Sequence, residues 1–323
     1  MTTTSRRLRT VSGLVVAAVL LVALAPLWVP LAVAVDLVRG RTRLPVARLL
    51  AFGVCWAWLE TGGVLAAVWL WATRRTGDLR AHVRLQRWWA LSLMRALRAT
   101  TGLDIAPPDL SPITPGPAVL LCRHASLADS LLSAWVVVGH AAMDPRYVLK
   151  RELLADPCLD IVGNRLRNHF VDRAAPDAEV ELAALRALSS DMGERDIAVI
   201  FPEGTRAAPA KRERALARIA ERDPERASRL AGLRHLLPPR PSGSQALVEG
   251  CPTADVVLGW HIGFEGLDTF GGILRHLSTT PRRIEFHARR VARADVPTGP
   301  GFARWLDDQW LQMDADVDRL LRS

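Results

Sequence analysis

Two short polar segments of the chain combine residue types that can move a proton and bind an anion. The first runs from Arg123 to Ser130 and places His124 and Asp129 in the spacing His-x-x-x-x-Asp. A histidine titrates near neutrality and suits the role of general base, and a carboxylate bonded to its other nitrogen fixes the tautomer. This pair therefore predicts activation of a hydroxyl nucleophile.

The first segment also fits a purely structural role. In Ser126-Leu-Ala-Asp129 the serine would cap a helix, and the aspartate would reach back to the amide of the cap as in a capping box. A histidine beside a capping aspartate is common, so this segment alone leaves both roles open. The second polar segment favours catalysis, because the two motifs together are far more specific than either one.

The second segment, Phe201-Pro-Glu-Gly-Thr-Arg206, has the composition of an anion-binding turn. A strand rich in Val and Ile runs into Gly204, and a glycine at a strand end lets backbone amides approach an anion closely. Thr205 adds a hydroxyl, and Arg206 adds a planar guanidinium that suits bidentate phosphate binding. We therefore expect a phosphate-bearing ligand here.

Alternating apolar runs and helical patterns must position these segments. Short apolar runs predict strands at residues 118–122, 147–149, 169–171, 196–201, 255–260 and 283–291. Helical patterns fall at residues 127–138, 177–190, 211–222, 227–236 and 301–321. Such alternation predicts an α/β domain with a mixed, mostly parallel sheet flanked by helices, in which His124 directly follows a strand end.

Two long apolar runs precede this domain. Residues 11–35 contain no charge and residues 49–71 contain only Glu60, so each run is long enough to cross a hydrocarbon core of about 30 Å. The outer flanks carry more arginines than the loop between, which favours a helical hairpin with both ends in the cytoplasm. A hairpin dipping into one leaflet is the alternative. Glu60 either marks a functional site or pairs with a neighbouring helix.

These features predict residues 1–75 as an N-terminal membrane hairpin and residues 76–323 as the catalytic domain. Residues 78–100 read as a basic amphipathic helix carrying tryptophan, which suits either the membrane interface or packing on the domain core. The net charge of +9 would also fit a nucleic-acid partner. However, Lys150 and Lys211 are the only lysines, and the arginine excess resembles the codon bias of a GC-rich genome. We expect no nucleic acid, but an anionic membrane surface, with the domain on the cytoplasmic side of a bacterial membrane.

With the spacing of His124 and Asp129 and the string Pro202-Glu-Gly-Thr-Arg206, the chain resembles the glycerolipid acyltransferases of the lysophosphatidate type. The resemblance covers roughly residues 118–258 and implies a glycerol-3-phosphate acyltransferase-like fold. It implies a membrane-bound enzyme that moves a fatty acyl group from acyl-CoA or acyl-carrier protein to the sn-2 hydroxyl of 1-acyl-glycerol 3-phosphate, giving phosphatidate. His124 would take the hydroxyl proton, and the alkoxide would attack the thioester directly, without a cofactor or metal.

The resemblance also implies which residues contact the acceptor. Between the two motifs these enzymes carry a lysine near a strand end and a glycine followed by an arginine, which here match Lys150, Gly163 and Arg173. The residues implied to hold the phosphate and glycerol are Lys150, Arg173, Glu203, Gly204, Thr205 and Arg206. Simpler roles for Lys150 and Arg173 are an exposed strand-end charge and a surface salt bridge. Residues 236–243 occupy the place of a fourth, proline-containing motif, or form a rigid loop.

Two departures from the family pattern leave the acceptor open. Arg123 stands where many members have asparagine, and no bulky aromatic lies between His124 and Asp129. The reaction class is unaffected, but the acceptor would equally be another lysophospholipid or a glycolipid.

Other functions need motifs that the sequence lacks. A serine esterase requires G-x-S-x-G, and a nucleotide-binding enzyme requires G-x-G-x-x-G or a Walker string. The histidines and the four cysteines show no metal-ligand spacing. A non-catalytic module that binds phospholipid through basic surfaces is the alternative from another class, and it would need neither His124 nor Asp129.

Overall fold

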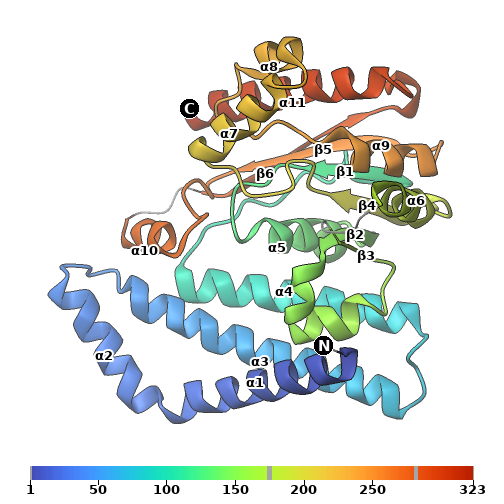
Figure 1. The fold of residues 1–323 in the computed structure, drawn as a ribbon. Coiled ribbons are helices and arrows are strands. Elements are labelled where there is room, and N and C mark those ends of the chain that lie inside the picture. Colours follow the sequence, from blue (N-terminus) through green and yellow to red (C-terminus); the bar gives the residue numbers. More distant parts are fainter. Residues whose placement is uncertain (1, 173–176, 280–282, 323) are drawn as a thin grey trace.

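The computed structural model describes residues 2–172, 177–279 and 283–322 (Figure 1). Its central element is a six-stranded sheet with the order β3-β2-β4-β1-β5-β6. The strands are β1 Ala118–Cys122, β2 Asp144–Lys150, β3 His169–Val171, β4 Asp196–Ile200, β5 Asp255–Ile262 and β6 Glu285–Val291. Neighbouring strands are parallel except β5 and β6, which are antiparallel. The predicted mixed, mostly parallel α/β sheet is confirmed.

The central strands consist largely of apolar residues that are buried on both faces of the sheet. All of β1 and nearly all of β4 and β5 are buried, which is typical of parallel strands covered by helices. In the register of the sheet, Leu121 of β1 lies opposite Ile200 of β4 and Leu258 of β5. The C-terminal ends of these three strands therefore lie at one edge of the sheet.

Helices cover the two faces of the sheet and enclose two hydrophobic cores. Two helices pack against Leu120 and Val199 on one face: α4 Leu79–Thr101 and α5 Asp129–Ala134. Helix α5 continues as a π-helix over Trp135–His140. Three helices pack against Val119 and Leu121 on the other face: α6 Ala178–Ser189, α9 Pro241–Gly250 and α11 Gly301–Arg322. The remaining α-helices of the catalytic region are α7 Pro209–Ala220, α8 Pro224–Leu230 and α10 Phe270–Ser278.

Most predicted elements are present with small shifts at their ends, and two differences have a local cause. The proline-containing segment 236–243 is a loop only as far as Arg240, because Pro241 begins α9. Proline fits the first turn of a helix, where no partner for its missing N–H is required. The second difference is α10, which the pattern does not predict because Gly271 and Gly272 weaken its helical signal.

The first apolar run is not one straight helix. It forms α1 Thr3–Ala23 and α2 Ala25–Val38, which meet at a bend of 73°. Pro26 lies in the first turn of α2 and cannot continue the hydrogen bonding of α1, which explains the break. The second run forms α3 Pro45–Ala72, and Asp36 caps it by accepting hydrogen bonds from Val46 N and Ala47 N at 2.9 and 3.1 Å.

Only α3 is by itself long and apolar enough to cross a membrane among the described residues. The number rises to two when the bent pair of α1 and α2 is counted as one span. The N-terminal hydrophobic helices are therefore present as predicted, and either a broken span or a re-entrant loop fits the first run.

Helix α4 connects these N-terminal helices to the catalytic region (Figure 1). Its buried residues Ala90, Met94 and Leu97 belong to the same core as Leu120 of β1, so the helix packs on the domain as the second interpretation of residues 78–100 requires. On its other side, Trp89 Nε1 donates a hydrogen bond to Glu60 Oε1 of α3 at 2.7 Å. The sequence left two roles for Glu60, and the structure shows the pairing with a neighbouring helix.

The first helix is attached to the catalytic region by an ion pair. Arg6 of α1 donates to both carboxylate oxygens of Asp160 at 3.0 Å, and Arg7 donates to Oδ1 at 3.2 Å. The side chain of Asp160 is fully buried, so a bidentate arginine is an appropriate partner for it. The contacts of α1 with Asp160 and of α3 with α4 thus hold the apolar helices against the domain.

Candidate active site

The two predicted motifs meet at the sheet edge where β1 and β4 end. His124 follows β1, the turn from Phe201 to Arg206 follows β4, and Ala207 N donates to the His124 carbonyl at 2.7 Å. Both motifs line one cleft of about 720 Å³. The predicted site residues in its lining are His124, Lys150, Gly204, Thr205 and Arg206. The shared cleft is the first requirement of a catalytic role, and the structure meets it.

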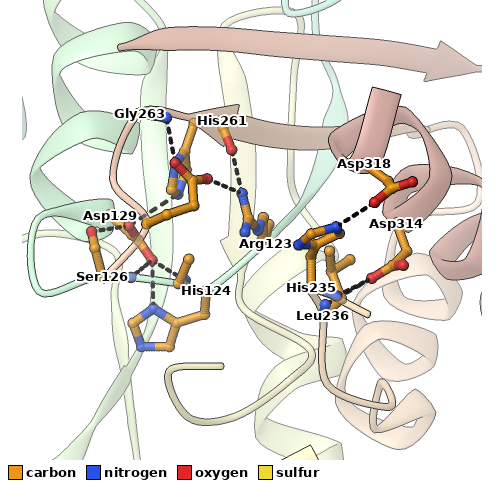
Figure 2. A network of polar contacts seen from close by, with 12 residues as sticks. Arg123, His124, Ser126, Asp129, His235, Leu236, His261, Gly263, Asp314 and Asp318 are labelled. Atoms are coloured by element: carbon orange, nitrogen blue, oxygen red, sulfur yellow. Dashed lines mark hydrogen bonds and ion pairs between the residues drawn. The ribbon is translucent and has the colours of Figure 1, made fainter. Parts of the chain in front are cut away.

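His124 and Asp129 form the expected pair. His124 Nδ1 lies 2.9 Å from Asp129 Oδ2, and the same oxygen accepts from Ala125 N at 2.6 Å and Ser126 N at 2.8 Å (Figure 2). The Ser126 hydroxyl donates to the other oxygen, Oδ1. Asp129 therefore caps the segment that begins α5 and bonds the imidazole at the same time, so its structural role does not exclude the predicted catalytic one.

The second ring nitrogen of His124 is available to a substrate. Among the described residues none makes a hydrogen bond with His124 Nε2, and the side chain, which is 15% exposed, lines the cleft. Because the Asp129 carboxylate is an acceptor, Nδ1 of His124 carries the proton that is shared with it. Nε2 therefore presents its lone pair to the cleft. The pair has the geometry of a general base with its orienting carboxylate.

The environment of Asp129 favours its charged form. Burial alone would raise the pKa of this carboxyl, but attraction to His261 and the hydrogen bond from His124 outweigh it and hold the pKa well below its usual range. An ionised carboxylate at this position can stabilise the imidazolium that forms when His124 takes a proton.

His261 is a neighbour of Asp129 that the sequence motifs do not identify. It lies in β5, and its Nε2 is 3.0 Å from Asp129 Oδ1. One feature of the sequence could have indicated it: His261 directly follows the predicted strand 255–260, and functional groups often lie at the C-terminal ends of parallel strands. The sequence does not show that β5 is adjacent to β1.

The side of the cleft that is predicted to bind an anion is built on a tight turn. Gly204 has a φ of +70°, which favours glycine, and its N–H donates to the Phe201 carbonyl at 2.9 Å. Lys211 Nζ donates to Thr205 Oγ1 at 3.4 Å and to the Arg206 carbonyl at 3.1 Å. Lys211 therefore fixes the turn, a role that the sequence motifs do not indicate. Within the described residues the Arg206 guanidinium has no hydrogen-bonding or ionic partner, so it suits an anionic ligand.

Glu203 lies behind the cleft and is not part of its lining. Its Oε1 accepts from His124 N at 2.8 Å, and its Oε2 accepts from Leu237 N at 2.9 Å. The carboxyl thus connects the loop after β1, the turn after β4 and the segment before α9. Burial raises its pKa to about 8, against the lowering effect of the two backbone hydrogen bonds. This position supports the loops that carry the site, and direct contact with an acceptor stays a prediction.

Three other residues singled out in the sequence have different positions. Arg173 lies outside the described residues. Gly163 ends a π-helical turn and packs against Phe170 of β3, away from the cleft lining. The Arg123 side chain is buried and binds Glu265 at 3.1 Å, so it does not line the cleft either.

Comparison with known proteins shows a family to which part of the chain is similar. Residues 104–241 match the model of the family described as Acyltransferase. No curated protein matches the chain. A solved structure of similar fold is the 1-acyl-sn-glycerophosphate (LPA) acyltransferase PlsC from Thermotoga maritima, with a TM-score of 0.46 and 15% identity over 80% of this chain and 98% of that chain.

The raised pKa of Glu203 predicts a pH-dependent contribution to stability. The folded protein keeps a proton on this carboxyl up to about pH 8, whereas the unfolded chain releases it near pH 4.5, so the contribution is full below pH 4.5 and falls as the pH rises to 8. Glu203→Gln has no titrating group at this position. The melting temperature of the wild type minus that of Glu203→Gln should therefore fall from pH 5 to pH 8. A rise of this signed difference over the same range would contradict the assignment.

Proposed function

We propose that this chain, of which residues 104–241 match the Acyltransferase family, is a glycerolipid acyltransferase. It would be a membrane-bound enzyme that acylates the sn-2 hydroxyl of 1-acyl-glycerol 3-phosphate. The acyl donor would be acyl-CoA or acyl-carrier protein, and the product would be phosphatidate. The observation that carries the proposal is that one cleft is lined both by an oriented imidazole and by the turn that we expect to bind phosphate.

The geometry supports a direct transfer. His124 Nε2 takes the proton of the acceptor hydroxyl while its oxygen attacks the thioester carbonyl, and Asp129 stabilises the resulting imidazolium. The tetrahedral intermediate collapses by breaking the carbon–sulfur bond. The departing thiolate then takes the proton from His124, which restores the base.

The residues around His124 suit a substrate with an anionic end and an apolar body. Lys150 and Arg206 supply positive charge and Thr205 a hydroxyl, which together would hold the phosphate and place the glycerol hydroxyl near the base. Much of the remaining lining is apolar, including Leu149, Leu182 and Leu185. Such a surface would accommodate a fatty acyl chain.

The apolar face of the N-terminal helices supports a membrane location. Large apolar side chains of these helices are exposed, among them Val16, Val19, Leu27, Leu31, Leu65, Val68, Trp69 and Trp71. A surface of this kind is unfavourable in water and suits contact with lipid. The substrates of the proposed reaction reside in the same phase.

A second candidate acceptor is a lysolipid with a polyhydroxyl headgroup. The cleft is also lined by Asp172 and Glu181, which pair with Arg151 and His169, and their remaining lone pairs would accept hydrogen bonds from sugar or inositol hydroxyls. The base and its carboxylate would be unchanged with such an acceptor. Only the headgroup contacts would differ.

Replacement of the base should abolish most of the transfer. We expect His124→Ala to lower kcat by about 10²-fold or more, because proton removal from the hydroxyl loses its general base. The assay follows labelled acyl-CoA and 1-acyl-glycerol 3-phosphate with purified protein in detergent. His140→Ala, at an exposed histidine outside the cleft, is the control and should retain the wild-type rate. A near-normal rate for His124→Ala would show that the proposed base is wrong.

Replacement of the phosphate-binding arginine should mainly affect acceptor binding. We expect Arg206→Ala to raise the KM for the lysolipid by about 10-fold, the loss typical of one charge-assisted hydrogen bond, with a smaller effect on kcat. Arg222→Ala, at an exposed arginine that follows α7 and lies outside the cleft, should leave KM unchanged. Equal KM values for the two variants would remove Arg206 from the acceptor site.

A panel of lysolipid acceptors decides between the two candidate substrates. With one labelled acyl-CoA, we expect the highest kcat/KM for 1-acyl-glycerol 3-phosphate, because its compact phosphate matches the basic side of the cleft. Lysophosphatidylglycerol, lysophosphatidylinositol and a lysoglycolipid complete the panel. A preference for a polyhydroxyl headgroup would keep the reaction class and replace the substrate.

A further inference from the structure

We propose that His261 is a positioning residue of this site, which holds the Asp129 carboxylate in the orientation that fixes the tautomer of His124. Its effect on turnover rests on the proposed acyl transfer, whereas its effect on the tautomer does not. The proposal starts from the carboxylate itself, which lies between two imidazoles, with His124 at Oδ2 and His261 at Oδ1 (Figure 2).

The position of His261 excludes contact with substrate. Its side chain is 4% exposed and does not line the cleft, whereas His124 does. His261 Nε2 approaches Asp129 Oδ1 to 3.0 Å, although the approach is not aligned as a hydrogen bond. Hydrogen bonds of catalytic groups are often poorly aligned before substrate binds and tighten in the complex. His261 therefore acts on the reaction only through Asp129.

The surroundings favour the tautomer of His261 that carries its proton on Nε2. Its Nδ1 is buried and has no hydrogen-bonding partner among the described residues. An N–H at Nδ1 would be buried without an acceptor, which is unfavourable. In this tautomer the nitrogen that carries the proton is the one 3.0 Å from Asp129 Oδ1, and the lone pair of Nδ1 is on the side without a partner.

A buried arginine fixes His261 in this position. Arg123 Nη1 donates to the His261 carbonyl and lies 3.1 Å from Glu265 Oε1. Glu265 Oε2 accepts from Gly263 N at 2.7 Å, and Gly263 has a φ of +94°, which favours glycine. The chain after β5 is thus held to the residue that directly precedes His124. Arg123, which departs from the family pattern, gains a structural role here.

The carboxylate needs this support because its two oxygens have different tasks. Oδ2 accepts from His124 Nδ1 and from the amides of Ala125 and Ser126. Oδ1 faces the Ser126 hydroxyl and His261. Rotation of the carboxylate would exchange these partners and weaken the bond to His124. A donor on Oδ1 opposes that rotation, so loss of His261 should release the tautomer of His124.

The test compares two substitutions of His261. His261→Phe keeps the ring shape and removes the donor, whereas His261→Gln places an amide N–H close to the position of Nε2. His287→Phe on the neighbouring strand β6 is the control, because His287 pairs with Glu285 and stacks on Trp260 without contacting Asp129. Two quantities are measured: kcat and KM for the acyl transfer, and the ¹⁵N spectrum of histidine-labelled protein, with His124 assigned from His124→Ala.

We expect His261→Phe to lower kcat by about 10-fold with an unchanged KM for the lysolipid, as for loss of a hydrogen bond to a charged group. In its ¹⁵N spectrum His124 should become a mixture of tautomers. His261→Gln and His287→Phe should keep both the wild-type kcat and the single Nδ1–H tautomer.

A wild-type tautomer of His124 in His261→Phe would overturn the proposal, whatever happens to kcat. It would also fail if His261→Gln lost the fixed tautomer as fully as His261→Phe, because the donor at Nε2 would then not be what holds the carboxylate. The ¹⁵N measurement needs no substrate. It therefore decides the role of His261 even if the wild-type protein proves unable to acylate lysolipids.

Discussion

The arrangement of the site depends on one buried, ionised carboxylate. An isolated charge in the protein interior is strongly unfavourable, and Asp129 is acceptable there because donors surround both of its oxygens. The donors come from the loop after β1 and from the imidazole of His124, and His261 of β5 lies 3.0 Å from Oδ1. The adjacency of β1 and β5 in the sheet is therefore a requirement of the site as well as of the fold. Because the same carboxylate begins α5, the helix and the base are positioned together.

Features carried by neighbouring residues could be predicted from the sequence. The pairing of His124 with Asp129 spans one turn of chain, and the turn at Gly204 follows directly from a glycine after an apolar strand. The mostly parallel sheet followed from the alternation of apolar runs and helices. Contacts between distant residues could not be predicted in this way, because strand order decides them. His261 is the main example, and the carboxyl of Glu203, which supports two loops and does not reach the cleft, is another.

The N-terminal helices and the catalytic region form one connected structure. Helix α4 shares its apolar residues with the core under β1, and its Trp89 binds Glu60 of α3. Asp160 binds two arginines of α1. The exposed apolar surface of the first three helices therefore has a fixed position relative to the cleft. For an enzyme with lipid substrates, such a connection would keep the base at a constant distance from the phase that holds them. The bend at Pro26 shows why hydropathy alone misjudges the first run, since length and composition do not register a break.

The central claim is that His124 and Asp129 act as one unit, and a double-mutant cycle tests it most directly. The kcat of acyl transfer is measured for wild type, His124→Ala, Asp129→Asn and the double variant. Residues that act as a unit have strongly non-additive effects, because loss of one removes the function of the other. The account predicts that the double variant is no slower than His124→Ala. Effects that multiply, so that Asp129→Asn lowers kcat by the same factor with and without His124, would contradict it.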